Sequence, residues 1–300
     1  MSLFHQLGNL DYGLLLPSIA RMPVPLARWL ADRRGDLHFF LDPSGRHAVR
    51  NLTWIFEHLD QRQIRFTARQ CFRTQSNDEM ESYWFDRPME DLLSQTSISG
   101  LDTLNAALGS GDGVLLYTGH MGSTGLFITL LGKMGIPVNL VFRNLEDVPS
   151  KPAAWYRYGK NRIRSLEKSS QRPVLYTGKR NYFQMRQKLR EGEALILGID
   201  AIPFARRRSV PVQFFARQAS FPEGPARLYL DSRARVLFWS ARPGKERRHH
   251  IEITDITNRL MPLHEVPAVV QILVDELEAR IRKHPGSWLV WSSLGSFFEG

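Results

Sequence analysis

One histidine lies where a short apolar run gives way to glycines, a setting that suits a catalytic base. His120 is the fourth residue of the stretch YTGHMGSTG, residues 117–125. Glycines let a substrate approach the main chain, and free N–H groups at a helix start stabilise negative charge. A histidine with a pKa near ~6.5 can take a proton from a hydroxyl that attacks a thioester. A lone histidine is more often structural, so residue type alone does not decide between the two roles.

Two further polar residues each follow a predicted strand. Arg143 comes directly after residues 138–142, and Asp200 closes the apolar run 193–199. Ligands of α/β sheets gather outside the carboxyl ends of the strands. We therefore expect His120, Arg143 and Asp200 at one edge of the sheet. The alternative for Asp200 is a cap of the next element.

Other candidate site residues have equally good structural explanations. Ser123 could hydrogen-bond His120, or it could cap the helix that follows. Arg143 could form a surface ion pair with Glu146 or Asp147, worth ~0–1 kcal/mol. The arginine run that includes Arg206 and Arg207 could hold a phosphate or lipid headgroup, or it could lie in a solvated loop.

Alternating strands and helices must position these residues. Their order predicts an α/β fold with a mostly parallel central sheet flanked by helices, preceded by an N-terminal helical region. We place the helical region at residues 1–96 and the α/β domain at 97–300. The predicted strands are 114–117, 138–142, 173–176, 193–199, 210–215, 236–241 and 250–254, and the predicted helices are 49–59, 66–73, 78–85, 126–134, 155–165, 183–190, 224–230 and 266–283.

Composition narrows the function classes. The 300 residues carry a formal net charge of +10, which attracts nucleic acid, anionic lipid or an acidic protein. No nucleic-acid-binding motif accompanies the charge, so we expect no nucleic-acid partner. The single cysteine, Cys71, excludes a disulfide framework, and we expect no metal site.

No apolar run reaches the roughly 20 residues that span a bilayer. The most apolar N-terminal segment, residues 14–30, is broken by three prolines and carries two arginines. It could lie in a membrane interface with Trp29 at headgroup depth, or it could pack on the protein's own core.

An ordered set of short motifs resembles the late acyltransferases of lipid A biosynthesis, in the lysophospholipid acyltransferase superfamily. The order and spacing are kept from about residue 46 to 291. The motifs are ISGLDTL (98–104), GDGVLLYTGHMG (111–122), FRN (142–144), LREG (189–192), ID (199–200), VPVQFF (210–215), GPARL (224–228) and IRKHPGSW (281–288). The N-terminal part matches weakly and lacks the transmembrane anchor usual in that family.

The resemblance implies a glycerol-3-phosphate acyltransferase-like fold and a histidine base, His120, that acts on an acceptor hydroxyl. The implied acyl donor is acyl carrier protein or coenzyme A, used as a co-substrate with no bound cofactor. Arg143 matches a family arginine that would hold a phosphate. Acidic carrier protein and the anionic inner membrane are then partners of the basic surface. We expect a cytoplasmic protein, peripheral on the inner face of the bacterial inner membrane.

The sequence departs from the family at one position of the motif. The family has an acid five positions after the histidine, and here that position is Gly125. In serine proteases, neutralising the carboxylate partner of the histidine costs ~10⁴ in rate. Three explanations are open: Asp200 orients His120 from a neighbouring strand, the acceptor is a more nucleophilic amine, or catalysis is lost. The last corresponds to a non-catalytic acyl-carrier or lipid-binding homologue, which is the alternative to an acyltransferase.

Overall fold

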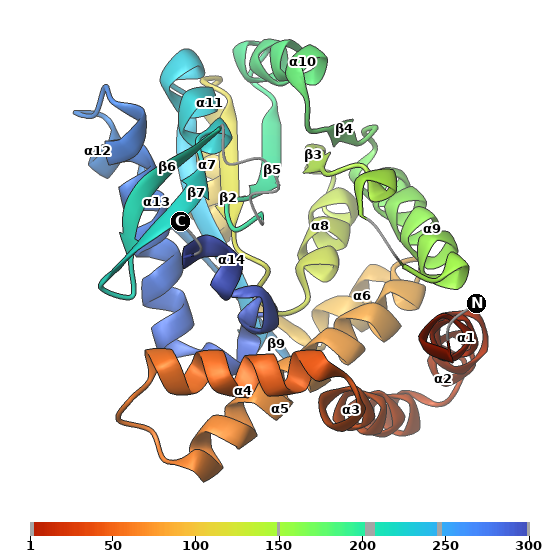
Figure 1. The fold of residues 1–300 in the computed structure, drawn as a ribbon. Helices are drawn as coiled ribbons and strands as arrows, with labels where there is room; N and C mark the ends of the chain where they lie inside the picture. Colours follow the sequence, from red (N-terminus) through yellow and green to blue (C-terminus); the bar gives the residue numbers. More distant parts are fainter. Residues whose placement is uncertain (1–2, 149–150, 202–207, 245–247, 299–300) are drawn as a thin grey trace.

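A seven-stranded sheet forms the centre of the protein (Figure 1). The computed structural model describes residues 3–148, 151–201, 208–244 and 248–298. Every neighbouring pair of strands is parallel except β8 and β9, which confirms the predicted α/β fold with a mostly parallel sheet. In spatial order the strands are β1 (Thr96–Ser99), β9 (His249–Asp255), β8 (Arg235–Pro243), β2 (Val114–Thr118), β5 (Ala194–Gly198), β3 (Val138–Phe142) and β4 (Leu175–Tyr176).

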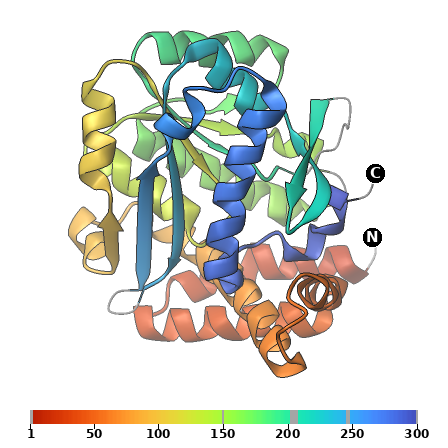
Figure 2. The ribbon, with the colours of Figure 1, turned by 90° about the vertical axis from the view of Figure 1, so that its left-hand side faces the viewer.

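Helices cover both faces of this sheet. Alternate residues of β2 point to opposite faces, so Leu115 and Tyr117 enter one hydrophobic cluster while Val114 and Leu116 enter another. The first cluster is shared with α10 (Lys179–Arg190), α11 (Gly224–Ser232) and α13 (Val266–Lys283), and the second with α7 (Leu101–Gly109), α8 (Thr124–Lys133) and α9 (Ala153–Ser170). Figure 2 shows α13 lying along its face of the sheet.

Helices also make up the chain before β1. They are α1 (Leu3–Leu10), the π-helical turn η1 (Asp11–Leu15), α2 (Leu16–Ala20), α3 (Val24–Leu41), α4 (Pro43–Ile55), α5 (Gln61–Glu81) and α6 (Met89–Leu93). The helix predicted at 66–73 lies within α5, but the separate helix predicted at 78–85 is wrong, because α5 continues without a break to Glu81. A capping box between Asp60 and Gln63 starts it. Its last turns bury polar side chains such as Asn77 and Asp78, so they lack the apolar periodicity that would have revealed them.

The N-terminal helices share a core with the sheet. Leu52 of α4, Phe56 just after that helix and Ile64 of α5 belong to the same buried cluster as Trp288 and the inner face of α13. In Figure 1 these helices lie below the sheet, at the end where the parallel strands finish. The division of the chain at residues 1–96 and 97–300 remains a prediction.

The remaining elements lie outside the main sheet. A two-stranded antiparallel hairpin consists of β6 (Ser209–Phe214) and β7 (Arg217–Pro222). The sequence predicted β6 but neither β7 nor β1, because both unforeseen strands mix polar residues into short segments. The other described elements are the short helices α12 (Thr257–Leu260) and α14 (Gly295–Phe298) and the 3₁₀ turns η2 (Ser82–Trp84), η3 (Leu145–Asp147), η5 (Pro285–Ser287) and η6 (Trp291–Ser293).

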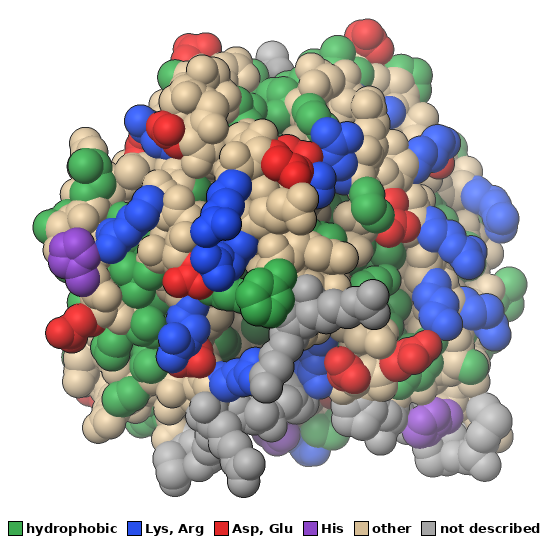
Figure 3. Space-filling model, turned by 90° about the horizontal axis from the view of Figure 1, so that it is seen from above, with side chains coloured by type: hydrophobic (Ala, Val, Ile, Leu, Met, Phe, Trp, Pro, Cys, Tyr) green, Lys and Arg blue, Asp and Glu red, His purple; other side chains and the backbone are tan. Residues whose placement is uncertain are grey.

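The surface gives two further observations. Seen from the side of α10 and α11, basic side chains are scattered among acidic and neutral ones and form no single basic patch (Figure 3). Among the described residues, no helix combines the length and the apolarity that a membrane crossing requires.

Candidate active site

His120 lies on a tight turn between β2 and α8. The turn is held by the C-terminal segment: the His120 carbonyl accepts from the N–H of Leu289, and the N–H of Gly122 donates to the carbonyl of Ser287, both at 2.9 Å. Gly122 has a φ of 61°, and a Cβ there would come within 2.5 Å of the carbonyl oxygen of Ala241. Only glycine fits this position without strain. The turn therefore presents the imidazole from a fixed main chain.

Asp200 lies beside this imidazole at the end of the adjacent strand. β2 and β5 are parallel with Thr118 level with Gly198, which brings the residue two positions beyond each strand end to the same height. Oδ1 of Asp200 lies 2.7 Å from Nδ1 of His120, and Oδ2 accepts from the His120 main-chain N–H at 2.8 Å. The expected approach of Asp200 to His120 is confirmed. Its catalytic role stays a prediction.

The hydrogen bond to Asp200 decides which ring nitrogen is available. A proton on Nδ1 is donated to the carboxylate, so Nε2 keeps its lone pair in the neutral ring. The His120 side chain is 57% exposed, whereas the Asp200 side chain is fully buried. The pair therefore has a buried carboxylate behind a reachable imidazole, which is the arrangement of a general base and its orienting acid.

Electrostatics couple the two groups. The negative charge of Asp200 raises the pKa of His120 above its ordinary value, and their hydrogen bond adds to this while burial opposes it. Burial alone would raise the pKa of Asp200. The charge of His120 and the hydrogen bonds that the carboxylate accepts outweigh burial, so that pKa is lowered. Asp200 is thus ionised wherever His120 would act as a base.

Trp288 is a site residue that sequence reasoning missed. Its side chain is fully buried. Its indole N–H also donates to Oδ2 of Asp200 at 2.8 Å. A buried indole usually finds a hydrogen-bond partner, and this was the available signal in the sequence. The partner could not be named, because Asp200 is 88 positions away in the chain.

Gly125, the position at which the resemblance predicts an acid, is buried in the first turn of α8. A Cβ there would lie 2.5 Å from Cζ of Phe85 and 3.0 Å from Nη2 of Arg162. Arg162 is itself paired with Asp78 of α5 at 2.8 Å. An aromatic ring and an ion pair therefore occupy the space that a side chain at position 125 would need.

Ser123 occupies the N-cap position of α8, as one alternative expected, but its hydroxyl makes no capping hydrogen bond. The hydroxyl donates to Oε2 of Glu81 at 2.8 Å, so the expected hydrogen bond to His120 is wrong. Glu81 also contacts Nε2 of His249 at 3.1 Å. Burial alone would raise the pKa of Glu81, but His249, Arg248 and Ser123 together lower it to about 2. This buried carboxylate attracts the serine more strongly than a solvent-exposed imidazole can.

Of the three candidate arginines, the structure describes Arg143. Arg143 follows β3, at the same edge of the sheet as Asp200, and its Nη2 donates to the main-chain carbonyl of Asp147 at 2.6 Å. The expected surface contact with this segment thus involves the backbone. Arg206 and Arg207 lie outside the residues that the structure describes. Phosphate binding by any of the three stays a prediction.

The fold and the site together define an α/β protein with a histidine–carboxylate pair at the carboxyl edge of its sheet. Residues 11–292 match the model of the bacterial lipid A biosynthesis acyltransferases, and the chain belongs to that family. A comparison with curated proteins finds no match. The resemblance seen in the ordered motifs is confirmed, and the family supports assignment of the chain as an acyltransferase.

Proposed function

We propose that the protein moves a fatty acyl chain from a thioester of acyl carrier protein or coenzyme A to a hydroxyl or amine of a lipid or lipid-like acceptor. The observation that carries the proposal is the 2.7 Å contact between Nδ1 of His120 and Oδ1 of Asp200, with the ring open to solvent. Family membership supports the reaction class. The contact supports His120 as the group that activates the acceptor.

In the proposed reaction, Nε2 of His120 takes the proton from the acceptor O–H or N–H as that atom attacks the thioester carbonyl carbon. A new C–O or C–N bond forms and the C–S bond breaks. The leaving thiolate takes the proton back from Nε2, so the base is regenerated and no cofactor is consumed. Asp200 fixes the ring and stabilises the imidazolium between these two proton transfers.

Asp200 is proposed to replace the acid that the family motif places at position 125. The carboxylate needs only to reach Nδ1, and it does so from the end of β5 as well as it could from α8. The packing of Phe85 and Arg162 around Gly125 leaves no room for the acid at the family's position. We therefore favour a rearranged acid over a loss of catalysis or a requirement for an amine acceptor.

We also propose that the N-terminal helices rest on an anionic membrane surface. Of the sixteen large hydrophobic side chains exposed among the described residues, ten lie between Leu7 and Leu41. Within residues 14–30 one side of the chain is buried through Leu16 and Ala27, while Trp29 is exposed on the other. One side of this segment therefore packs on the protein's own core, as one alternative predicted. Its exposed side suits a membrane interface, which was the other alternative. The net charge of +10 favours anionic lipid.

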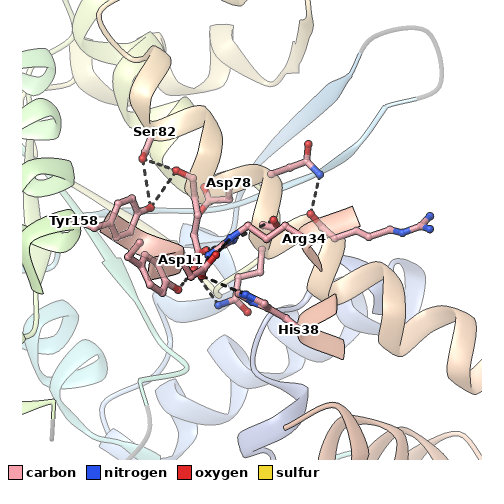
Figure 4. Close-up of polar contacts among 12 residues, drawn as sticks. Asp11, Arg34, His38, Asp78, Ser82 and Tyr158 are labelled. Carbon is pink, nitrogen blue, oxygen red and sulfur yellow. Dashed lines mark hydrogen bonds and ion pairs between the residues drawn. The ribbon is translucent and has the colours of Figure 1, made fainter. Parts of the chain in front are cut away.

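A buried polar network holds these helices in place (Figure 4). Arg34 of α3 pairs with Asp11 at 2.6 Å and with Glu79 of α5 at 2.7 Å. Tyr158 of α9 accepts from Ser82 at 3.3 Å and so joins α9 to the end of α5. Removing one partner of a buried ion pair costs about 3–5 kcal/mol, so loss of Arg34 should loosen the packing of α3 against α5.

The function is tested by lipid analysis in a living host. The chain is expressed in a bacterium with ample acyl carrier protein, and lipids are compared by mass spectrometry between wild type and His120→Ala. We expect a new acylated lipid with the wild type and its loss with the variant. His264→Ala, which removes an exposed histidine distant in sequence from the site, is the control and should keep the product. A product that persists at the wild-type level in His120→Ala would exclude His120 as the base.

A second measurement separates transfer from binding alone. Purified protein is incubated with acyl carrier protein thioester, and release of free thiol is followed. Slow hydrolysis that is lost in both His120→Ala and Asp200→Asn supports catalysis. Tight binding of the thioester with no release, and with no new lipid in the host, would instead identify a binding homologue.

A further inference from the structure

A cavity of about 130 Å³ adjoins the turn that carries His120. Its wall includes Ser123 of that turn, Arg73 and Asn77 of α5, Arg242 near the end of β8, and Arg248 and His249 at the start of β9. About 10–15 Å³ of such volume is enough for one water molecule, so this cavity has space for a group of several atoms. It lies at the carboxyl edge of the sheet, within three residues of the proposed base.

The cavity carries unbalanced positive charge. Arg73 pairs with Asp36, whose Oδ1 lies 2.7 Å from Nε and which also pairs with Arg33 and Arg69. His249 contacts Glu81. Asp32 also lines the cavity, and its Oδ1 accepts from Asn77 at 2.7 Å. Within the described residues, no carboxylate pairs with Arg242 or Arg248. Among the described residues that line the cavity, the guanidinium groups of Arg242 and Arg248 therefore form no ion pair, and one carboxylate, that of Asp32, is present. Arg248 still interacts with the charge of Glu81, which is not part of the wall.

Arg242 has an unsatisfied donor. Its Nη1 donates to the main-chain carbonyl of Pro243 at 3.2 Å, but its Nε is buried without any partner among the described residues. A buried N–H without an acceptor is destabilising, and a charged acceptor in the cavity would relieve it. Guanidinium groups match the oxygens of phosphate in geometry and charge.

We infer that this cavity binds a phosphate group of a substrate, through Arg242 and Arg248. The inference rests on the proposed function for the source of that phosphate, which is either the lipid acceptor or the acyl donor. Arg143, a phosphate-binding candidate of the sequence, is not among the residues that line this cavity. A phosphate held here would fix its substrate beside the turn that presents the imidazole, which lowers the entropic cost of bringing the reacting atoms together.

Binding is tested first with inorganic phosphate and no turnover. Isothermal titration calorimetry is performed on the full chain at constant ionic strength, with chloride as the reference anion. Arg242→Gln and Arg248→Gln should each weaken phosphate binding about tenfold, as expected for a charge-assisted hydrogen bond. Arg190→Gln, an exposed arginine before the amino end of β5, is the control with the same charge change and should bind as wild type.

Two outcomes would overturn the site. One is saturable phosphate binding that the Arg242→Gln, Arg248→Gln double variant leaves unchanged. The other is no binding by wild type at millimolar phosphate. Circular dichroism of each variant shows whether it is folded. If Arg242→Gln is unstable, Arg242→Lys takes its place; it keeps the charge and should retain part of the phosphate affinity.

The source of the phosphate is separated by kinetics. If the donor supplies it, Arg242→Gln raises KM for acyl coenzyme A but not for acyl pantetheine, which lacks phosphate. If the acceptor supplies it, KM rises for a phosphorylated lipid and not for its dephosphorylated form. Phosphate binding by a wild-type protein that transfers no acyl chain would reject the proposed function and leave the site intact. Acyl transfer by a wild-type protein that binds no phosphate would reject the phosphate site and leave the proposed function intact.

Discussion

The indole N–H of Trp288 donates to Oδ2 of Asp200, the same oxygen that accepts the main-chain N–H of His120. The other oxygen of this carboxylate contacts the imidazole. Asp200 is therefore held on Oδ2 by two donors while Oδ1 orients the ring. A C-terminal tryptophan thus completes a site whose other members come from the two central strands. We expect it to be a positioning residue, because its N–H contacts Asp200.

Trp288→Phe should lower both stability and kcat. The change removes one hydrogen bond to a buried charge, which contributes about 1.5–3 kcal/mol, and leaves Asp200 less firmly fixed. Trp239→Phe is a matched control, since Trp239 is also fully buried but its N–H has no partner among the described residues. Urea unfolding of both variants isolates the hydrogen bond from the loss of ring volume. We expect kcat to fall about tenfold for Trp288→Phe alone, with KM little changed. Equal losses in both variants would mean that the indole acts only by packing.

Asp200→Asn should reduce kcat strongly and move its pH dependence. In serine proteases the equivalent change costs ~10⁴ in rate, because the ring loses its orienting acid. Asp200 raises the pKa of His120. A base acts only when deprotonated, so wild-type activity should fall as pH drops through a value above 6.5. In Asp200→Asn, the pH at which activity falls should be lower than in the wild type. Asp86→Asn, which removes an exposed carboxylate, should leave the profile where it is.

The same pair predicts a pH window for stability. The raised pKa of His120 stabilises the fold below the ordinary value of 6.5, and this contribution is lost as pH rises through the folded-state pKa. The lowered pKa of Asp200 stabilises the fold above 3.8, and this is lost as pH falls through its folded-state pKa. The stability difference between wild type and Asp200→Asn should therefore be largest between pH 3.8 and 6.5. Thermal unfolding across pH 3–9 measures it, and a difference independent of pH would contradict the coupling.

Gly125→Asp should destabilise the protein and should not raise activity, although it restores the family's acid. A Cβ at this position would overlap the buried ring of Phe85. Overpacking of this kind costs about 1–3 kcal/mol, which exceeds the gain of about 1 kcal/mol from replacing a helical glycine. Gly109→Ala is the control, because a Cβ there meets nothing within 4 Å and should be neutral or stabilising. A faster and equally stable Gly125→Asp enzyme would show that Asp200 is an incomplete substitute.

Phe40→Ser should weaken binding to anionic vesicles without loss of stability. Phe40 is 69% exposed on α3, within the apolar N-terminal surface. Burying such a side chain in lipid contributes about 1.5 kcal/mol or more, so affinity should fall about tenfold. Phe183→Ser is a close match, because Phe183 is 68% exposed on α10, at the opposite end of the molecule (Figure 1). Vesicle flotation compares the two variants. Equal weakening by both would reject α3 as the membrane surface.

Local patterns in the sequence were sufficient for the fold class and for two members of the site. Apolar runs such as residues 194–198 form strands because their side chains are buried on both faces of a parallel sheet. His120 and Asp200 each follow such a run, and parallel strands finish at one edge. That geometry made their position at the same edge of the sheet predictable, whereas their contact depended on the strand order.

Tertiary structure alone decided which side chains meet. Strand order placed β5 next to β2, and with it Asp200 level with His120. The packing of the C-terminal segment against the turn brought Trp288 to the same carboxylate, and the arrangement of α5 with β8 and β9 formed the cationic cavity. These contacts join residues tens to hundreds of positions apart. They depend on how the whole chain buries its apolar surface, whereas periodicity and spacing report only on neighbours along the chain.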